Sequence, residues 1–178
     1  MDTRTAAEWL NPVKAAGIGS YLVASISCGV TAIRVADLRL SRLAAGLGLI
    51  QVALLLDIAF DWRWRLYDWL RSQAVAGHWY EVRHWPQVFT LAVLALVLCG
   101  AAVAARRRLR PFPGAVWAVE GTLLSAGCWM TEVISLHVTD SILYYRVGLM
   151  MVISFLWAAA CLMTSLGILK AGIGDKAA

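Results

Sequence analysis

Apolar residues gather into five long runs that are separated by shorter polar segments. These runs cover approximately residues 15–33, 40–60, 88–105, 114–136 and 147–169. A helix needs about 20 apolar residues to cross roughly 30 Å of hydrocarbon, and the first, third and fifth runs have this length without a charged residue. The pattern therefore predicts an all-α, polytopic membrane protein. About five transmembrane helices would form a single domain over residues 1–178.

Residues 61–76 have a different pattern, in which apolar and charged side chains are mixed. The residues that recur at the spacing of one helix face are Trp62, Leu66, Trp69, Leu70 and Gln73. Five of the nine tryptophans lie in the connection 61–87, and this side chain prefers the level of lipid headgroups. We expect an amphipathic helix over 61–76 that lies on the outer membrane surface. A lid over a pocket is the alternative.

The composition supports the membrane assignment. The chain is 61% hydrophobic and 15% charged, whereas soluble domains have about 45–50% apolar and about 25% charged residues. These figures exclude a soluble globular domain, a coiled coil and a secreted disulfide scaffold. The net charge of +5 is expected for a membrane protein with basic cytoplasmic loops. Since no DNA- or RNA-reading motif is found, we expect the lipid bilayer rather than nucleic acid as a partner.

The basic residues of the loops predict the orientation. They lie in the first connection (Arg34, Arg39, Arg42), in the third (Arg106, Arg107, Arg108, Arg110) and in the tail (Lys170, Lys176). Because lysine and arginine collect in cytoplasmic loops, these segments are expected inside. We therefore expect a multi-pass protein of the cell inner membrane with its N-terminus outside and its C-terminus cytoplasmic. Four arginines in the connection 61–87 oppose this orientation.

Two polar residues fall deep inside predicted spans. Gln51 is expected to form a hydrogen bond between helices, because an amide in hydrocarbon needs a partner. Glu120 is expected to pair with the basic segment 106–110.

All three histidines lie on the outer side in this topology, together with five acids: Asp57, Asp61, Glu81, Glu132 and Asp140. The candidate ligand-binding residues are Glu132, His137, Asp140 and Asp57. The candidate metal ligands are His84, His137, Glu132 and His78. Glu132 lies about one helical turn inside its span, so this carboxylate must be neutral, paired with a cation or coordinating one.

Three interpretations of this outer cluster are open. Acids and histidines at helix ends could simply reach water and headgroups. Imidazoles with carboxylates could instead hold a transition metal such as Zn, Fe, Cu or Mn. Finally, His84 and His137 could ligate one b-type haem, or one of them could hydrogen-bond a quinone carbonyl. His78 and His84 are six residues apart, and Glu132 and His137 are five apart. Neither of these spacings matches a known metal-ligand motif.

The sequence predicts a function only in general terms. The first hypothesis is a small membrane binding or accessory protein, either a subunit of a larger membrane complex or a homo-oligomer. The alternative is a small membrane-embedded enzyme or redox protein, with a single haem or a non-haem metal, acting on a lipid-soluble substrate. A transporter or channel is disfavoured because three runs contain no ionisable residue. No motif of a soluble enzyme family is present, and the sequence leaves open whether the protein is an enzyme.

The predicted topology can be tested by accessibility labelling. A cysteine introduced at Ser72 and a tag at the C-terminus should lie on opposite sides of the membrane, because an odd number of helices separates them. Labelling of intact cells with a membrane-impermeant maleimide would show this in a variant without the native cysteines. If both sites react from the same side, the five-helix topology is wrong.

Overall fold

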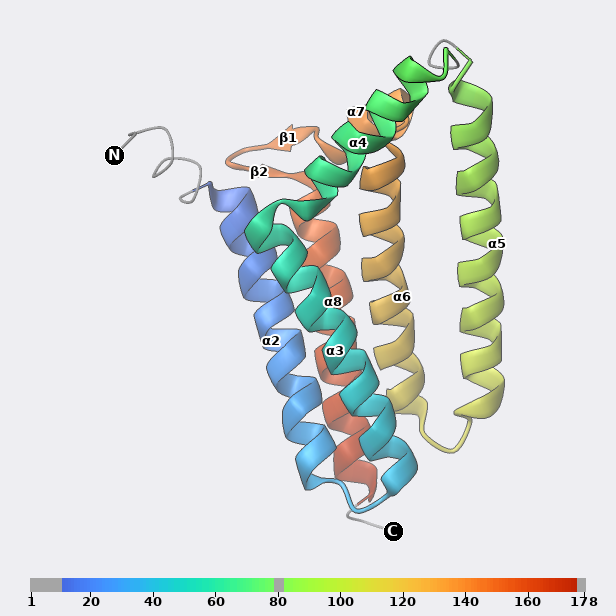
Figure 1. Cartoon of the computed structure of the whole chain (residues 1–178). Helices are drawn as coiled ribbons and strands as arrows, with labels where there is room; N and C mark the ends of the chain where they lie inside the picture. Colours follow the sequence, from blue (N-terminus) through green and yellow to red (C-terminus); the bar gives the residue numbers. More distant parts are fainter. Residues whose placement is uncertain (1–10, 79–81, 176–178) are drawn as a thin grey trace.

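The computed structural model of the protein describes residues 11–78 and 82–175, and the described chain is helical apart from one short β-hairpin (Figure 1). The helices are α2 (Pro12–Arg34), α3 (Leu38–Phe60), α4 (Trp62–Ala76), α5 (His84–Arg108), α6 (Pro113–Ile134), α7 (His137–Leu143) and α8 (Val152–Asp175). The hairpin consists of β1 (Arg146–Val147) and β2 (Met150–Met151), paired antiparallel. The predicted all-α class is confirmed.

Four of the described helices, α2, α3, α5 and α8, are long and apolar enough to cross a membrane. Each coincides with one of the uncharged or nearly uncharged runs of the sequence. Helix α6 is 22 residues long, but it carries two glutamates, Glu120 and Glu132. The long helices make the chain a helical bundle of membrane-spanning composition.

Local signals explain where the first helices begin and end. Asn11 caps α2, since its side chain accepts a hydrogen bond from the amide of Val13 at 3.0 Å. Asp37 caps α3 by accepting hydrogen bonds from the amides of Arg39 and Leu40. Asp61 adopts the left-handed conformation, with φ 58° and ψ 34°, directly between α3 and α4. This one residue turns the chain so that α4 runs across the end of the bundle instead of continuing α3.

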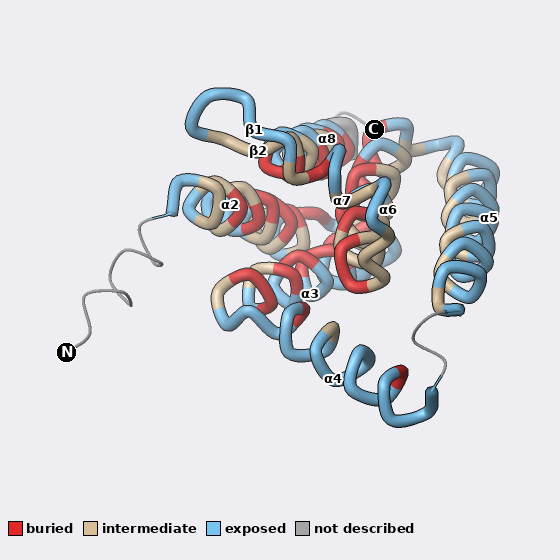
Figure 2. Tube along the Cα trace, turned by 90° about the horizontal axis from the view of Figure 1, so that it is seen from above, coloured by how far each residue is buried: buried red, intermediate tan, exposed pale blue. Residues whose placement is uncertain are grey.

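Helices α2, α3, α6 and α8 lie side by side, and α5 stands at the edge of the bundle (Figures 1 and 2). Helix α8 packs against both α2 and α6, while α5 packs mainly against α6. Helix α4, helix α7 and the hairpin gather at one end of the bundle (Figure 1), which we call the α4 end. None of the residues of α5 is buried.

Helices α6 and α8 approach so closely that their backbones touch at glycines. A Cβ atom added to Gly121 would lie 2.5 Å from the carbonyl oxygen of Ala160. One added to Gly167 would lie 2.6 Å from the carbonyl oxygen of Gly114. Small residues allow such contact between helices in lipid, where apolar burial provides little driving force. The α6–α8 pair is therefore a tightly packed unit inside the bundle.

A buried polar layer crosses the middle of the bundle. The side-chain amide of Gln51 on α3 donates to Thr122 Oγ1 on α6 at 3.1 Å and lies 3.4 Å from Thr164 Oγ1 on α8. The predicted interhelical role of Gln51 is thus confirmed. The predicted pairing of Glu120 is also confirmed, since Arg106 Nε donates to its carboxylate at 2.5 Å.

The described structure differs from the sequence pattern at two helix ends. The fifth apolar run begins at residue 147, but α8 begins at Val152 because Gly148, with φ 65°, closes the hairpin. The fourth run extends to residue 136, but α6 ends at Ile134, where Ser135 adopts a left-handed φ of 49°. His137 consequently begins α7 and does not lie on α6.

The glycine contacts can be tested with one substitution and a matched control. Gly121→Ala should destabilise the protein by about 1–3 kcal/mol, because the added methyl group meets backbone atoms of α8. Gly100→Ala should be neutral or stabilising, since nothing lies within 4 Å of its Cβ position and alanine favours helix. Denaturant titration in detergent measures both. Equal stabilities would mean that α6 and α8 do not pack this closely.

Candidate functional site

A cluster of buried charged residues at the α4 end is centred on Arg63. This arginine lies in the first turn of α4 and projects into the bundle because of the turn at Asp61. Its Nε atom lies 2.9 Å from Asp57 Oδ2 on α3, and its Nη1 atom lies 2.5 Å from Glu132 Oε2 on α6. The side chains of Arg63 and Asp57 are each 6% exposed and that of Glu132 is 2% exposed. One guanidinium therefore joins three helices.

Two aromatic side chains complete this cluster. The hydroxyl group of Tyr144 donates a hydrogen bond to Glu132 Oε1 at 3.2 Å. The guanidinium carbon of Arg63 lies 5.1 Å from the ring centroid of Trp157 on α8, which is a cation–π distance. Burial, and then the carboxylate of Glu132, raise the pKa of Tyr144 above its ordinary value. The phenol consequently stays protonated and acts as a donor.

The charges of this cluster do not balance. Asp57 and Glu132 contribute two carboxylates, whereas Arg63 contributes one guanidinium. In the described part of the chain, neither oxygen of Asp57 accepts a hydrogen bond of good geometry, so its contact with Arg63 is an ion pair rather than an aligned hydrogen bond. A buried excess charge is costly. The cluster is neutral only when it also holds one proton or a cationic group.

A cavity of about 280 Å³ opens beside the cluster. The residues that line it are Asn11, Val13, Lys14, Ile58, Asp61, Arg63, Trp64, Glu132, Tyr144, Met151, Ile153 and Trp157. Lys14 and Asp61 form an ion pair of 2.6 Å across the more exposed part of this lining. The charged groups of the lining are balanced, since Lys14 and Arg63 face two acids.

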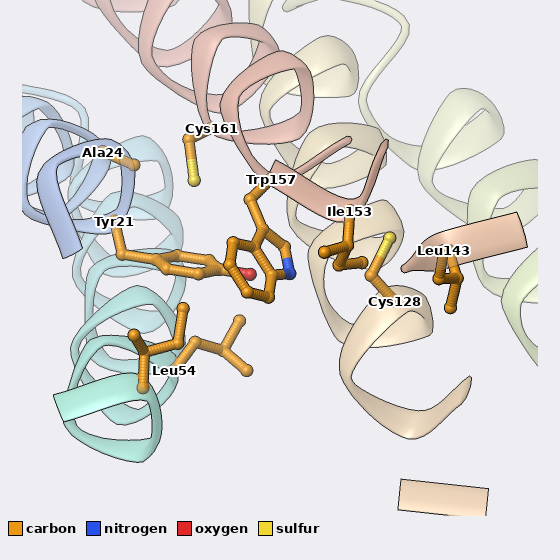
Figure 3. Packing of buried hydrophobic residues seen from close by; sticks show 9 residues of the cluster. Tyr21, Ala24, Leu54, Cys128, Leu143, Ile153, Trp157 and Cys161 are labelled. Carbon is orange, nitrogen blue, oxygen red and sulfur yellow. The ribbon is translucent and has the colours of Figure 1, made fainter. Parts of the chain in front are cut away.

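The inner wall of the cavity rests on an apolar cluster. Trp157 and Ile153 belong to a buried group that also contains Tyr21, Leu54 and Ile58. Figure 3 shows the rings of Tyr21 and Trp157 side by side above Leu54, with Ile153 farther along α8. Because these side chains are packed, Trp157 presents a fixed surface both to Arg63 and to the cavity. The cavity thus combines a rigid apolar wall with buried hydrogen-bonding groups.

The structure brings together two of the residues predicted from the sequence, Asp57 and Glu132. Asp140 lies apart from them and accepts a hydrogen bond from Ser135 Oγ at 2.6 Å, which stabilises the turn between α6 and α7. Asp140 therefore has a local structural partner and does not line the cavity.

The predicted histidines lie elsewhere. His78, His84 and His137 are all exposed, and none of them lines the cavity. Among residues 11–78 and 82–175, no group of three or more His, Cys, Asp or Glu side chains is arranged to hold a metal ion. The metal site and the haem site remain predictions, because the described structure does not bring their predicted ligands together.

Three residues of the site were not singled out by the sequence pattern: Arg63, Tyr144 and Trp157. A signal for Arg63 did exist, because buried carboxylates such as Asp57 and Glu132 require a cation at the same end of the bundle. Arg63 is the basic residue nearest to Asp57 in the sequence on that side. Tyr144 and Trp157 gave no comparable signal, since their roles depend on how α7 and α8 pack.

Comparisons with known proteins add nothing to this geometry: no family model, curated protein or solved structure matches the chain.

The central role of Arg63 predicts a large effect of its removal. Arg63→Ala should destabilise the protein by about 3–5 kcal/mol, because it leaves two buried carboxylates without a cation. Asp57→Asn should cost less, since it removes the excess negative charge. Unfolding titrations in detergent compare these variants with wild type.

Arg65→Ala provides the matched control for this experiment. Arg65 lies on the same helix but is exposed, so its removal should change stability by less than about 0.5 kcal/mol. If Arg63→Ala and Arg65→Ala unfold alike, the buried ion-pair cluster does not hold the α4 end together.

Proposed function

We propose that the protein is a multi-pass inner-membrane protein with five spans, α2, α3, α5, α6 and α8. Helix α6 is the fifth span, and its length of 22 residues corresponds to about 33 Å of helix. Its acids do not oppose insertion, because Glu120 pairs with Arg106 and Glu132 pairs with Arg63. The adjacent helices α5 and α8 lie along its whole length (Figure 1).

In this proposal the α4 end faces outward and the C-terminus is cytoplasmic. The support is the charge of the opposite end, where Arg106, Arg107 and Arg108 form the last turn of α5. Helix α4 then lies at the outer interface. Its side chains Trp62 and Trp69 are 49% and 57% exposed, as expected for tryptophans at the level of headgroups.

We further propose that the protein binds a neutral, lipid-soluble ligand in the cavity beside Arg63. The observation that carries this proposal is the combination of buried polar groups and an apolar wall around one cavity. Such a combination suits a molecule with an apolar body and one polar end. When the Arg63 cluster holds one proton, the charges around the cavity balance, which favours a neutral ligand over an ion. A quinone-like carbonyl compound has the required chemistry.

Each lining residue has a defined role in this proposal. Arg63 supplies N–H donors for a carbonyl oxygen, and Glu132 accepts from a hydroxyl group of the ligand. Tyr144 orients Glu132 by donating its hydroxyl group to this carboxylate. Trp157, Ile153 and Ile58 contact the apolar part. The ion pair between Lys14 and Asp61 lies where the ligand would enter, so this contact would have to open or shift on binding.

A role as a subunit of a larger membrane complex is the second candidate. One observation favours it: α5 has no buried residue in the described chain, although it contains the most apolar 18-residue stretch of the four long helices. A partner helix could cover this surface, as could a second copy of the chain or lipid.

The ligand proposal can be tested with decylubiquinone as the probe. The probe should raise the melting temperature of the purified wild-type protein, because a ligand that binds only the folded state stabilises it. It should also quench tryptophan fluorescence through Trp157. Glu132→Gln should weaken binding of the reduced probe, decylubiquinol, roughly tenfold, because a hydroxyl group of the quinol loses its charged acceptor.

His137→Ala is the informative control, since His137 is exposed and outside the cavity. Binding of decylubiquinone should be unchanged in this variant. Loss of binding in His137→Ala with retention in Glu132→Gln would overturn the cavity proposal in favour of the histidine site. The cavity proposal would also be overturned if the purified wild type contained one zinc ion per chain and His137→Ala contained none.

A further inference from the structure

A second cavity of about 280 Å³ lies between α4, α5 and α6, away from Arg63. The residues that line it are Tyr67, Leu70, Arg71, Ala74, Arg83, Pro86, Gln87, Thr90, Val133 and Ile134. We call it the α4–α5–α6 groove. It shares no lining residue with the cavity beside Glu132, so a ligand in the groove would be separate from the one proposed for that cavity, although its assignment rests on the proposed membrane placement.

Two basic residues line the groove, Arg71 and Arg83. None of the lining residues within 11–78 and 82–175 is acidic. Each arginine already has an interaction within the chain, but a guanidinium carries five N–H donors and can serve more than one acceptor. Two guanidinium groups around one cavity suit a phosphate, which arginine binds through paired hydrogen bonds.

The rest of the groove is mainly apolar. Leu70 and Pro86 form part of its walls, and Val133 and Ile134 contribute from α6. Farther along α5, Phe89 and Val93 are exposed apolar side chains. A free phosphate ion would gain nothing from these surfaces, whereas acyl chains would cover them.

The position of the groove fits the depth of a lipid headgroup. It lies where α4 crosses from the end of the bundle to the start of α5 (Figures 1 and 2). In the proposed membrane placement, α4 lies at the interface, so Arg71 and Arg83 are level with phosphates and α5 extends into the hydrocarbon. Anionic headgroups attract basic residues at this level.

We propose that the α4–α5–α6 groove binds one anionic phospholipid, whose phosphate contacts Arg71 and Arg83 and whose acyl chains follow α5 and α6. Phosphatidylglycerol has the required charge. Gln87 contributes to the shape of the groove rather than to lipid binding, because its side-chain amide donates to the carbonyl oxygens of Ile134 and Ser135 at the end of α6.

Native mass spectrometry of the full-length protein in detergent tests this proposal. Phosphatidylglycerol and phosphatidylcholine with identical acyl chains are added in equal amounts. Wild type should bind one phosphatidylglycerol in preference to phosphatidylcholine. The double variant Arg71→Gln with Arg83→Gln should bind phosphatidylglycerol roughly 30-fold more weakly, given the contribution expected of two interfacial arginines.

Arg65→Gln is the matched control, because it removes the same charge from an exposed position on α4 outside the groove. It should change lipid affinity by less than about twofold. If the double variant does not fold, the single variants should each weaken binding about fivefold. Glu132→Gln should keep full lipid affinity, which separates this site from the proposed ligand cavity.

Three results would overturn the proposal. The first is equal affinity for the two phospholipids in wild type. The second is an equal loss of affinity in Arg65→Gln and in the groove variants, which would indicate attraction by overall charge. The third is displacement of phosphatidylglycerol by inorganic phosphate at millimolar concentration, which would make the groove a phosphate site instead.

Discussion

The ion pairs of Arg63 with Asp57 and Glu132 are the interaction on which the α4 end depends. They connect α4 to α3 and to α6, and the contact of Arg63 with Trp157 adds α8. Without this buried cation, few contacts would hold α4 against the bundle, since the only other buried residue of this helix is Ala74. The first turn of α4 therefore determines the position of the helix, and with it both cavities.

Packing in lipid explains why polar and very small residues carry so much of this fold. Apolar side chains gain little by leaving lipid for a protein interior, so close backbone contact and hydrogen bonds must select one arrangement of helices. Gly121 and Gly167 provide the close contact between α6 and α8. Gln51 selects the register of three helices by pairing with Thr122 and Thr164. The Arg63 cluster does the same at the α4 end.

The long helices were predictable because an uninterrupted apolar run has few other stable structures in a membrane. The hairpin was not, since Val147 and Leu149 continue the apolar run and only Gly148 marks the turn. On α4, the sequence pattern did not indicate that Arg63 and Ala74 face the bundle. Trp62 and Trp69 of the predicted apolar face are exposed. The histidines were predicted as ligands because imidazole binds metals and haem. Periodicity alone does not show whether a side chain at a helix end faces inward.

The additional carboxylate of the cluster, Asp57, affects the neighbouring cavity through Arg63. Asp57 pairs with Arg63 but is not among the residues that line the cavity, and Trp157 supports the guanidinium, so Arg63 is held in place before any ligand arrives. A ligand that hydrogen-bonds to this guanidinium does not have to order a flexible side chain or strip it of water, and both costs normally reduce affinity. The desolvation of the charged groups was already compensated during folding. In the proposed binding mode, Asp57 would thus contribute to affinity without touching the ligand.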